Sequence, residues 1–320
     1  MKFRTLLISI TFAAFSTGVA LAQAWPSKPI RLIVPFPAGG PTDQLSRKLG
    51  QALSAGLGQP VIIENIGGAM GSIGLARLAK LPADGYSIGL GAHSTHAIAP
   101  HVNKLSYDPV KDLQAVGGLV TFAYVLVANP NEQAKDIPDL VRRSKTLPGG
   151  ITFGSSGPGG GNHILGEMLA LQTGAVLRHI PYKGVAPAQQ DVMAGHIGFM
   201  FDVESTAAPM IKAGKLKGLG VTGNKRSAAL PDVPAIAETV PDFGGLGWFA
   251  FFGPKGMPDE VLRRLNSEIN KAYSTPELAG YLEGAGYTAI IGSPNLLAKT
   301  VETDYAQWGK AIKTSGIKSE

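Results

Sequence analysis

Short apolar runs alternate with amphipathic helical patterns along most of the chain. Ile30–Val34 is an aliphatic, β-branched run that predicts a buried strand, and Leu45, Leu49 and Leu53 form one apolar stripe of a helix predicted over Asp43–Leu57. Further strands are predicted at Val61–Glu64, Ser87–Gly91, Ile151–Gly154, Val176–Ile180, Ile197–Phe201 and Lys217–Val221. Helix-length segments separate them. This alternation predicts an α/β fold with mostly parallel sheets and right-handed crossovers.

Two stretches break this rhythm and predict a division into two lobes. The segment 115–128 is long, apolar and strand-like, and a Pro/Gly-rich passage over 231–247 precedes the apolar strand Trp248–Phe252. Both stretches suit crossings between lobes, and we expect Trp248 and Phe249 to lie in the core. The expected divisions are 23–125 together with 247–320 for lobe 1, and 126–246 for lobe 2.

The loop after the first strand, Pro35–Asp43, is rich in Pro and Gly and has no charged residue before Asp43. It leads into a helix, for which Thr42 or Asp43 is the expected N-cap. Amide groups of such a loop and of the first helical turn can converge on an anion. An ordinary Gly-rich turn between a strand and a helix has the same pattern, so this loop alone leaves both interpretations open.

Two further loops and one acid follow predicted strands, where ligands of open α/β sheets bind. Gly91–His96 carries four hydrogen-bonding side chains in a row. Gly154–His163 is glycine-rich and precedes the predicted helix Ile164–Thr173, so its backbone can approach a ligand closely. Asp202 is either a helix N-cap or part of a solvated turn, or it accepts a hydrogen bond from a ligand, directly or through an ordered water.

The first 22 residues have the pattern of a secretory signal peptide. A basic start, Met1–Arg4, precedes an apolar stretch over Leu6–Leu21, and Ala20–Ala22 fits a cleavage site. A membrane anchor is the less favoured alternative because polar residues and a glycine interrupt the apolar core. The chain has no cysteine, which excludes disulfides, a thiol nucleophile and a lipid-modified N-terminal Cys. We therefore expect a monomer that diffuses freely in the bacterial periplasm.

Composition and motifs disfavour several other classes of protein. The net charge is +6 and falls by two, to +4, when the signal peptide is removed, and no basic tract with interleaved aromatics indicates nucleic-acid binding. Gly154–Gly157 is one residue short of a nucleophile elbow, and a serine paired with His163 or His93 would need an orienting carboxylate. His93, His96 and His101 lack a metal-ligand spacing. We expect no catalytic residue, no cofactor and no metal.

Motifs spread over the whole mature chain resemble those of the Bug-type substrate-binding proteins of tripartite tricarboxylate transporters. Each motif is short, and the resemblance depends on their number and common order. They are Trp25–Ile30, Val34–Asp43, Gly58–Val61, Pro82–Tyr86, Tyr107–Asp112, Pro181–Gly184, Met200–Asp202, Ile211–Lys215 and Leu230–Pro234.

This resemblance implies a two-lobed periplasmic binding protein fold of type II. Each lobe would be a mixed, mostly parallel sheet flanked by helices, and the lobes would close on a small carboxylate. In the family, the loops that match Phe36–Thr42 and Ser155–His163 hold carboxylates from opposite sides, often through ordered waters, while Gly91–His96 and Asp202 match other cleft positions. The implied ligand-binding residues are Phe36, Pro37, Ala38, Gly39, Gly40, Thr42, Asp43, His93, Ser94, Thr95, Ser155, Ser156, Gly159, Gly160, Gly161, Asn162, His163 and Asp202.

The resemblance also implies a partner, the multi-spanning permease of a tripartite tricarboxylate transporter with its large and small subunits. A sensor kinase of a two-component system is the alternative, because both partners need the same closed receptor. A periplasmic hydrolase is the least favoured alternative.

Some positions depart from the family pattern. Pro37 and Pro41 replace small or hydroxyl residues, and Gly160-Gly161-Asn162 replaces a segment that commonly carries Thr or Ser. The loss of hydroxyl donors enlarges that end of the pocket and favours a larger carboxylate, aromatic or a longer di-acid. His93 and His96 are candidates to supply donors in place of the lost hydroxyls.

Overall fold

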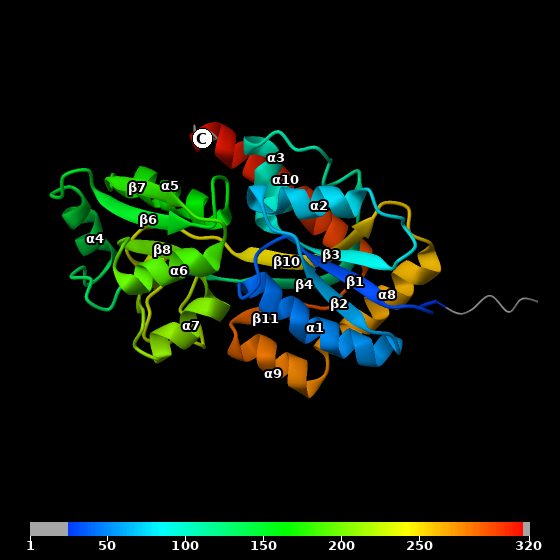
Figure 1. Cartoon of the computed structure of the whole chain (residues 1–320). Helices are drawn as coiled ribbons and strands as arrows, with labels where there is room; N and C mark the ends of the chain where they lie inside the picture. The colour runs from blue at the N-terminus through cyan, green and yellow to red at the C-terminus, as the bar shows by residue number, and fades with distance from the viewer. Residues whose placement is uncertain (1–24, 316–320) are drawn as a thin grey trace, which may run out of the picture.

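The computed structural model describes residues 25–315 as two β-sheets that lie side by side, each flanked by helices (Figure 1). The expected signal peptide, residues 1–22, lies outside the described residues. One sheet has six strands in the order β11-β4-β10-β3-β1-β2, and the other has five in the order β7-β6-β8-β5-β9.

The six-stranded sheet combines the first and last parts of the chain. Its strands are β1 (Ile30–Val34), β2 (Val61–Asn65), β3 (Ser87–Ala92), β4 (Leu113–Phe122), β10 (Gly247–Pro254) and β11 (Tyr287–Ile290). Its helices are α1 (Pro41–Leu57), α2 (Ser72–Ala79), α3 (Ala99–Val102), α8 (Asp259–Tyr273), α9 (Pro276–Gly284) and α10 (Pro294–Ser315), with the short turns η1 (Ala69–Gly71) and η2 (Ser94–Ile98). Helix α9 and strand β11 were not anticipated from the sequence.

Strand β1 is apolar except for Arg31 because both of its faces are covered. Leu32 packs in the same core as Leu49 of α1 and Leu265 of α8, whereas Ile33 packs with Leu78 of α2 on the opposite face. The four aliphatic side chains of β1 are fully buried, and Arg31 is partly buried. A largely apolar run of this kind is typical of a parallel strand that lies between two layers of helices.

The five-stranded sheet is formed by the middle of the chain. Its strands are β5 (Tyr124–Ala128), β6 (Ile151–Ser155), β7 (Leu177–Pro181), β8 (Phe199–Val203) and β9 (Lys217–Val221). Its helices are α4 (Ile137–Ser144), α5 (Gly161–Thr173), α6 (Val185–Ala194) and α7 (Glu204–Lys212), with the turn η3 (Ile236–Glu238). Both sheets are mixed, and the crossing strands β4, β5 and β10 make antiparallel pairs, so the parallel share is smaller than the alternation suggested.

The apolar stretch 115–128 is divided at Ala123 into β4 and β5, which belong to different sheets. The expected division after residue 125 therefore falls within β5, and the chain returns to the six-stranded sheet at Gly247. Thr222 links the two chain segments that connect the sheets, one at Ala123 and the other before Gly247. Its hydroxyl accepts a hydrogen bond from the Tyr124 amide at 2.9 Å and donates to the Gly245 carbonyl at 2.8 Å.

The two halves also touch away from the crossings. Ile312, near the end of α10, packs with Ile164 of α5 and with Ile98 and Val102 beside α3. Helix α10 thus belongs to the six-stranded half but reaches the start of α5, as the red helix in Figure 1 shows. This apolar contact favours the arrangement in which the halves lie close together.

Candidate functional site

A cavity of about 520 Å³, partly open to solvent, lies between the two halves. Both halves contribute to its wall, and most of the wall is apolar. The lining residues are Phe36, Pro37, Gly40, Pro41, Thr42, Ser94, Tyr124, Ser156, Gly161, Asn162, Val185, Ala186, Val203 and Phe249. No Asp, Glu, Lys, Arg or His occurs among these described lining residues. An anion in this cavity would therefore meet dipoles rather than formal charges.

Four helices begin at the cavity wall. Gly40, the N-cap of α1, and Gly161, the first residue of α5, both line the cavity, as do Val185 at the start of α6 and Val203, the N-cap of α7. None of these four N-caps has a side chain that caps its helix. Each helix N-terminus carries partial positive charge, so together they make the cavity favourable for an anion.

The first-turn amides of α1 and α5 remain available. Among residues 25–315, the amides of Thr42, Asp43, Asn162 and His163 donate no hydrogen bond to another protein group. Buried amides are normally paired, and Thr42 and Asn162 line the cavity, so these amides are open to a partner from outside the chain, either solvent or a ligand.

Asp43 stabilises the loop between β1 and α1 but is not the N-cap of α1. Helix α1 begins at Pro41, two residues earlier than expected, and Gly40 rather than Thr42 or Asp43 is the N-cap. The Asp43 carboxylate accepts hydrogen bonds from the Gly39 amide at 3.0 Å, from Arg47 at 2.9 Å and from Asn65 at 3.0 Å. Burial alone would raise the pKa of Asp43, but these hydrogen bonds, led by that of Arg47, outweigh it and lower the pKa. Asp43, Ala38 and Gly39 lie outside the cavity wall.

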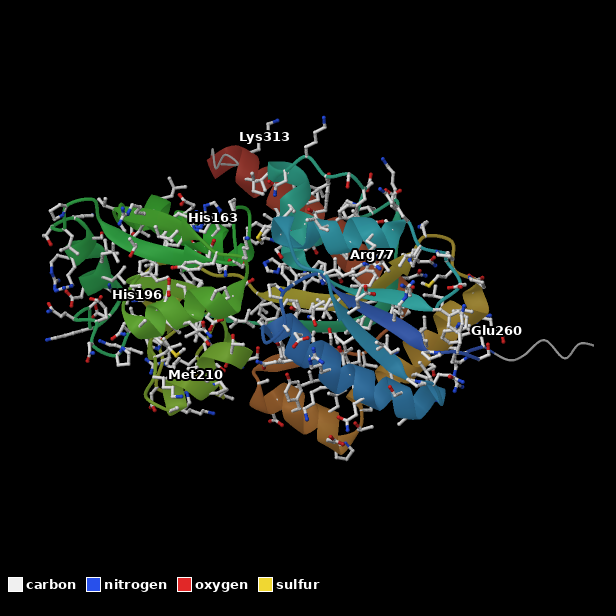
Figure 2. The ribbon with its side chains drawn as sticks, viewed as in Figure 1. Arg77, His163, His196, Met210, Glu260 and Lys313 are labelled. Carbon is white, nitrogen blue, oxygen red and sulfur yellow. The ribbon has the colours of Figure 1, made fainter. Side chains whose placement is uncertain are left out.

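The glycine-rich loop before α5 forms the opposite wall. The Asn162 Oδ1 atom accepts hydrogen bonds from the amide and the hydroxyl of Ser156, at 3.2 and 3.0 Å, and both residues line the cavity. The Gly159 amide donates to His163 Nδ1 at 3.0 Å. His163 lies on the side of its lobe that faces the other half, whereas His196, beyond the end of α6, lies far from it (Figure 2). Ser155, Gly159, Gly160 and His163 shape this loop but do not line the cavity.

The segment Gly91–His96 is not a loop. Strand β3 continues to Ala92, and Ser94–Ile98 forms the π-helical turn η2. The Thr95 hydroxyl lies 2.9 Å from the amide and the carbonyl of Ala92 and from His96 Nδ1. Ser94 alone of this segment lines the cavity, and its hydroxyl has no hydrogen-bond partner within the described chain.

His93 and His96 are buried among aromatic rings. His96 stacks on Phe252 with 4.0 Å between ring centroids, and His93 lies beside Tyr124, Trp248 and other rings. Burial lowers the pKa of His93 to about 4 and that of His96 to about 3, so both rings are neutral at pH 7. Neither ring lines the cavity, although His93 Nε2 lies 3.4 Å from the hydroxyl of Tyr124, which does.

Asp202 is fully buried at the end of β8 and connects two of the helices that begin at the cavity. Its carboxylate accepts hydrogen bonds from Gln189 of α6 at 2.6 Å and from Thr206 of α7 at 2.7 Å. It does not line the cavity. Burial raises the pKa of Asp202 to about 6 despite these hydrogen bonds. The structure thus places Asp202 behind the wall, where it orients α6 and α7.

The raised pKa gives a pH-dependent stability. Between about pH 4 and 6 the folded chain holds a proton on Asp202 that the unfolded chain has released, so stability falls as the pH rises through this window. Asp202→Asn cannot ionise. The free energy of unfolding of the variant minus that of the parent is expected to increase from pH 4 to pH 6, by up to about 3 kcal/mol at 1.36 kcal/mol per pH unit.

Urea unfolding of the parent and of Asp202→Asn between pH 4 and pH 6 measures the difference in their free energies of unfolding. His93 and His96 have lowered pKa values and act in the opposite direction, but they are present in both proteins and cancel. If the difference in unfolding free energy stays constant from pH 4 to 6, the raised pKa of the buried Asp202 carboxyl group is contradicted.

Several cavity residues were missed in the sequence. Tyr124, Val185, Ala186, Val203 and Phe249 line the cavity, and Phe249 is also a buried core residue as expected. Burial, with the nearby charge of Asp202, raises the pKa of Tyr124, so its phenol stays protonated. Pro181–Gly184 before α6 was a sequence signal that could have marked that helix start.

The cavity carries no catalytic arrangement among the residues described. The Ser155 hydroxyl lies 2.6 Å from Nε2 of His179, and not of His163 or His93, but Ser155 is fully buried and out of a substrate's reach. Across residues 25–315, no three His, Asp or Glu side chains come together in a way that could hold a metal ion.

Comparison with known proteins identifies the family. Residues 45–317 match the model of the tripartite tricarboxylate transporter family receptor. The chain belongs to this family. It is 33% identical to Protein BugT of Bordetella pertussis, with 99% of each chain covered. The family resemblance seen in the sequence motifs is thereby confirmed.

Solved structures agree with this assignment. Rpa4515 of R. palustris, solved with adipate, is 31% identical with a TM-score of 0.88, over 92% of this chain and 99% of that one. MatC of Rhodopseudomonas palustris, solved with malate, is 27% identical with a TM-score of 0.85, over 90% and 100% of the two chains. The two-sheet periplasmic binding protein fold is confirmed, and the family is one of receptors rather than enzymes. None of the helices described here is long and apolar enough to cross a membrane.

Proposed function

We propose that the chain is a periplasmic receptor that captures a carboxylate with an apolar body and delivers it to the permease of a tripartite tricarboxylate transporter. The observation that carries the proposal is the convergence of four uncapped helix N-termini on a cavity without charged side chains. Such a site favours an anion, while the apolar wall favours methylene or aromatic groups between or beside its carboxylates.

Hydrogen-bond donors on both walls of the cavity support binding of a carboxylate from two sides. The hydroxyls of Thr42 and Ser94 donate to no protein group within residues 25–315, and neither does the side-chain amide nitrogen of Asn162. Each hydrogen bond to a charged carboxylate contributes roughly 1.5–3 kcal/mol. A few of them, after the cost of ordering the ligand and closing the lobes, suffice for micromolar affinity, about 8 kcal/mol.

The relatives support the ligand class. One was solved with adipate and another with malate, and both of these ligands are dicarboxylates. The Phe, Pro and Val side chains in the wall make the apolar chain of an adipate-like ligand the better match for this cavity. Pro37 and Pro41, which stand where the family commonly has small or hydroxyl residues, favour the same class of ligand.

A thermal-shift screen tests the proposal. Mono-, di- and tricarboxylates, aromatic acids and neutral diamides are compared at one pH and salt concentration. We expect stabilisation by one class of carboxylate that grows with its concentration as RT ln(1 + [L]/Kd). Stabilisation by uncharged solutes alone would overturn the proposal.

A further inference from the structure

A second, outer chamber adjoins the cavity. It encloses about 1180 Å³, part of which is open to solvent, and shares Phe36, Pro37 and Ser156 with the inner cavity. The rest of its wall comes from segments 68–72 and 103–105 of the six-stranded half and from segments 156–158 and 181–184 of the five-stranded half. The two spaces are therefore neighbours between the lobes, with these three residues at their common boundary.

Contacts across the chamber hold its walls together. Met70 has a left-handed backbone, with φ 54° and ψ 34°, and its side chain reaches the glycine-rich loop of the other half. A Cβ atom at Gly157 would lie 2.9 Å from Met70 Sδ, and one at Gly184 would lie 3.2 Å from Pro37. The two halves meet closely here because glycine leaves room for the opposing side chains.

The chamber wall is positively charged. Lys104 and Lys183 line it from opposite halves, and its described lining includes no Asp or Glu. Both lysines are exposed, and neither forms a hydrogen bond or an ion pair with another residue in the range 25–315. By contrast, Lys111 pairs with Asp108 and Lys271 with Glu268. Two unpaired cations on either side of one opening attract an anionic group.

We propose that the outer chamber binds a second anionic group of the same ligand, carried at the far end of an elongated dicarboxylate, with Lys104 and Lys183 as its counter-charges. This inference rests on the proposed function, because the first carboxylate must be held by the helix N-termini of the inner cavity. The far carboxylate stays partly hydrated between exposed lysines, so its contribution is modest and depends on salt.

Calorimetric titration with straight-chain diacids from succinate to sebacate, and with the monoacid of each chain length, tests the inference. In the double variant Lys104→Ala/Lys183→Ala, we expect the Kd of the long diacids to rise about fivefold to tenfold. At high salt concentration this rise in Kd is expected to be smaller. The Kd of the monoacids and of succinate is expected to stay the same. The matched control is Lys215→Ala/Lys299→Ala, which removes the same charge from exposed lysines away from both cavities.

The outcomes separate this inference from the proposed function. If no carboxylate binds the parent protein, the proposed function fails. If short diacids bind and the double variant matches the parent for every chain length, the outer site is overturned while the proposed function stands. If the double variant loses affinity equally for monoacids and diacids, or if the control variant loses as much affinity, the lysines act only through general electrostatic attraction. Either result would also overturn the outer site.

Discussion

Gly161→Ala is expected to weaken carboxylate binding by one to two orders of magnitude while leaving both lobes folded. A Cβ atom at Gly161 would lie 2.5 Å from His93 Nε2 and 2.5 Å from the Tyr124 hydroxyl. Both rings are buried in an aromatic cluster and cannot move aside cheaply. Overpacking of this kind costs roughly 1–3 kcal/mol. His93 belongs to the opposite half, so the added methyl group acts against closure.

Calorimetric titration gives the affinity, and thermal unfolding without ligand gives the stability of the lobes. Gly280→Ala is the matched control, because Gly280 lies in α9 with nothing within 4 Å of an added Cβ atom. The control is expected to bind as the parent does and to be more stable by about 0.5–1 kcal/mol, since alanine favours the helix. Parental affinity in Gly161→Ala would show that binding does not need the close approach of α5 to His93.

Gly160→Asp is expected to remove detectable carboxylate binding, and Gly160→Asn to weaken it about tenfold. Gly160 is the N-cap of α5 with φ −69° and ψ 154°, a conformation that any residue adopts. Asp and Asn are strong N-cap residues whose side-chain oxygen accepts from the first-turn amides. Either side chain would therefore occupy the amides that we assign to the ligand, and Asp would add a negative charge beside it.

The stability of these variants distinguishes competition from damage. A Cβ atom at Gly160 would approach Met70 Cε at 2.8 Å, and Asn162 Oδ1 and Ser156 Oγ at 2.9 Å, so small shifts are needed. A side-chain cap in place of the glycine N-cap contributes only a few tenths of a kcal/mol in the opposite direction. The unfolding free energy of both variants is expected to stay within about 1 kcal/mol of the parent. Equal affinities for Asp and Asn would contradict a ligand with a full negative charge near this helix start.

The sequence was most informative where the signal is local. Neighbouring residues alone indicate the apolar run of β1, the Gly-rich segments before α1 and α5, and the two interruptions of the strand–helix alternation. From these signals we predicted two lobes, with one loop from each lobe at the cavity. The start of α1 was misplaced because Pro41 suits the first helical turn better than it suits a loop.

Other site features depend on contacts between distant segments. Tyr124 and Val203 reach the cavity because β5 pairs with β8 next to the crossing between sheets. His93 and His96 were expected to offer donors to a ligand, but the π-helical turn after β3 places both rings against Trp248. Nothing in the local pattern distinguishes a polar residue that faces a ligand from one that packs against aromatic rings of β10.

Calorimetric titration with a matched pair of ligands tests most directly the claim that uncapped helix N-termini recognise a carboxylate. The pair consists of the dicarboxylate that stabilises the protein most in the thermal-shift screen and its neutral diamide, which has nearly the same shape. We expect the dicarboxylate to bind with micromolar affinity, about 8 kcal/mol, and the diamide to show no measurable heat of binding. Comparable affinity for the diamide would contradict recognition of an anion by these helix starts.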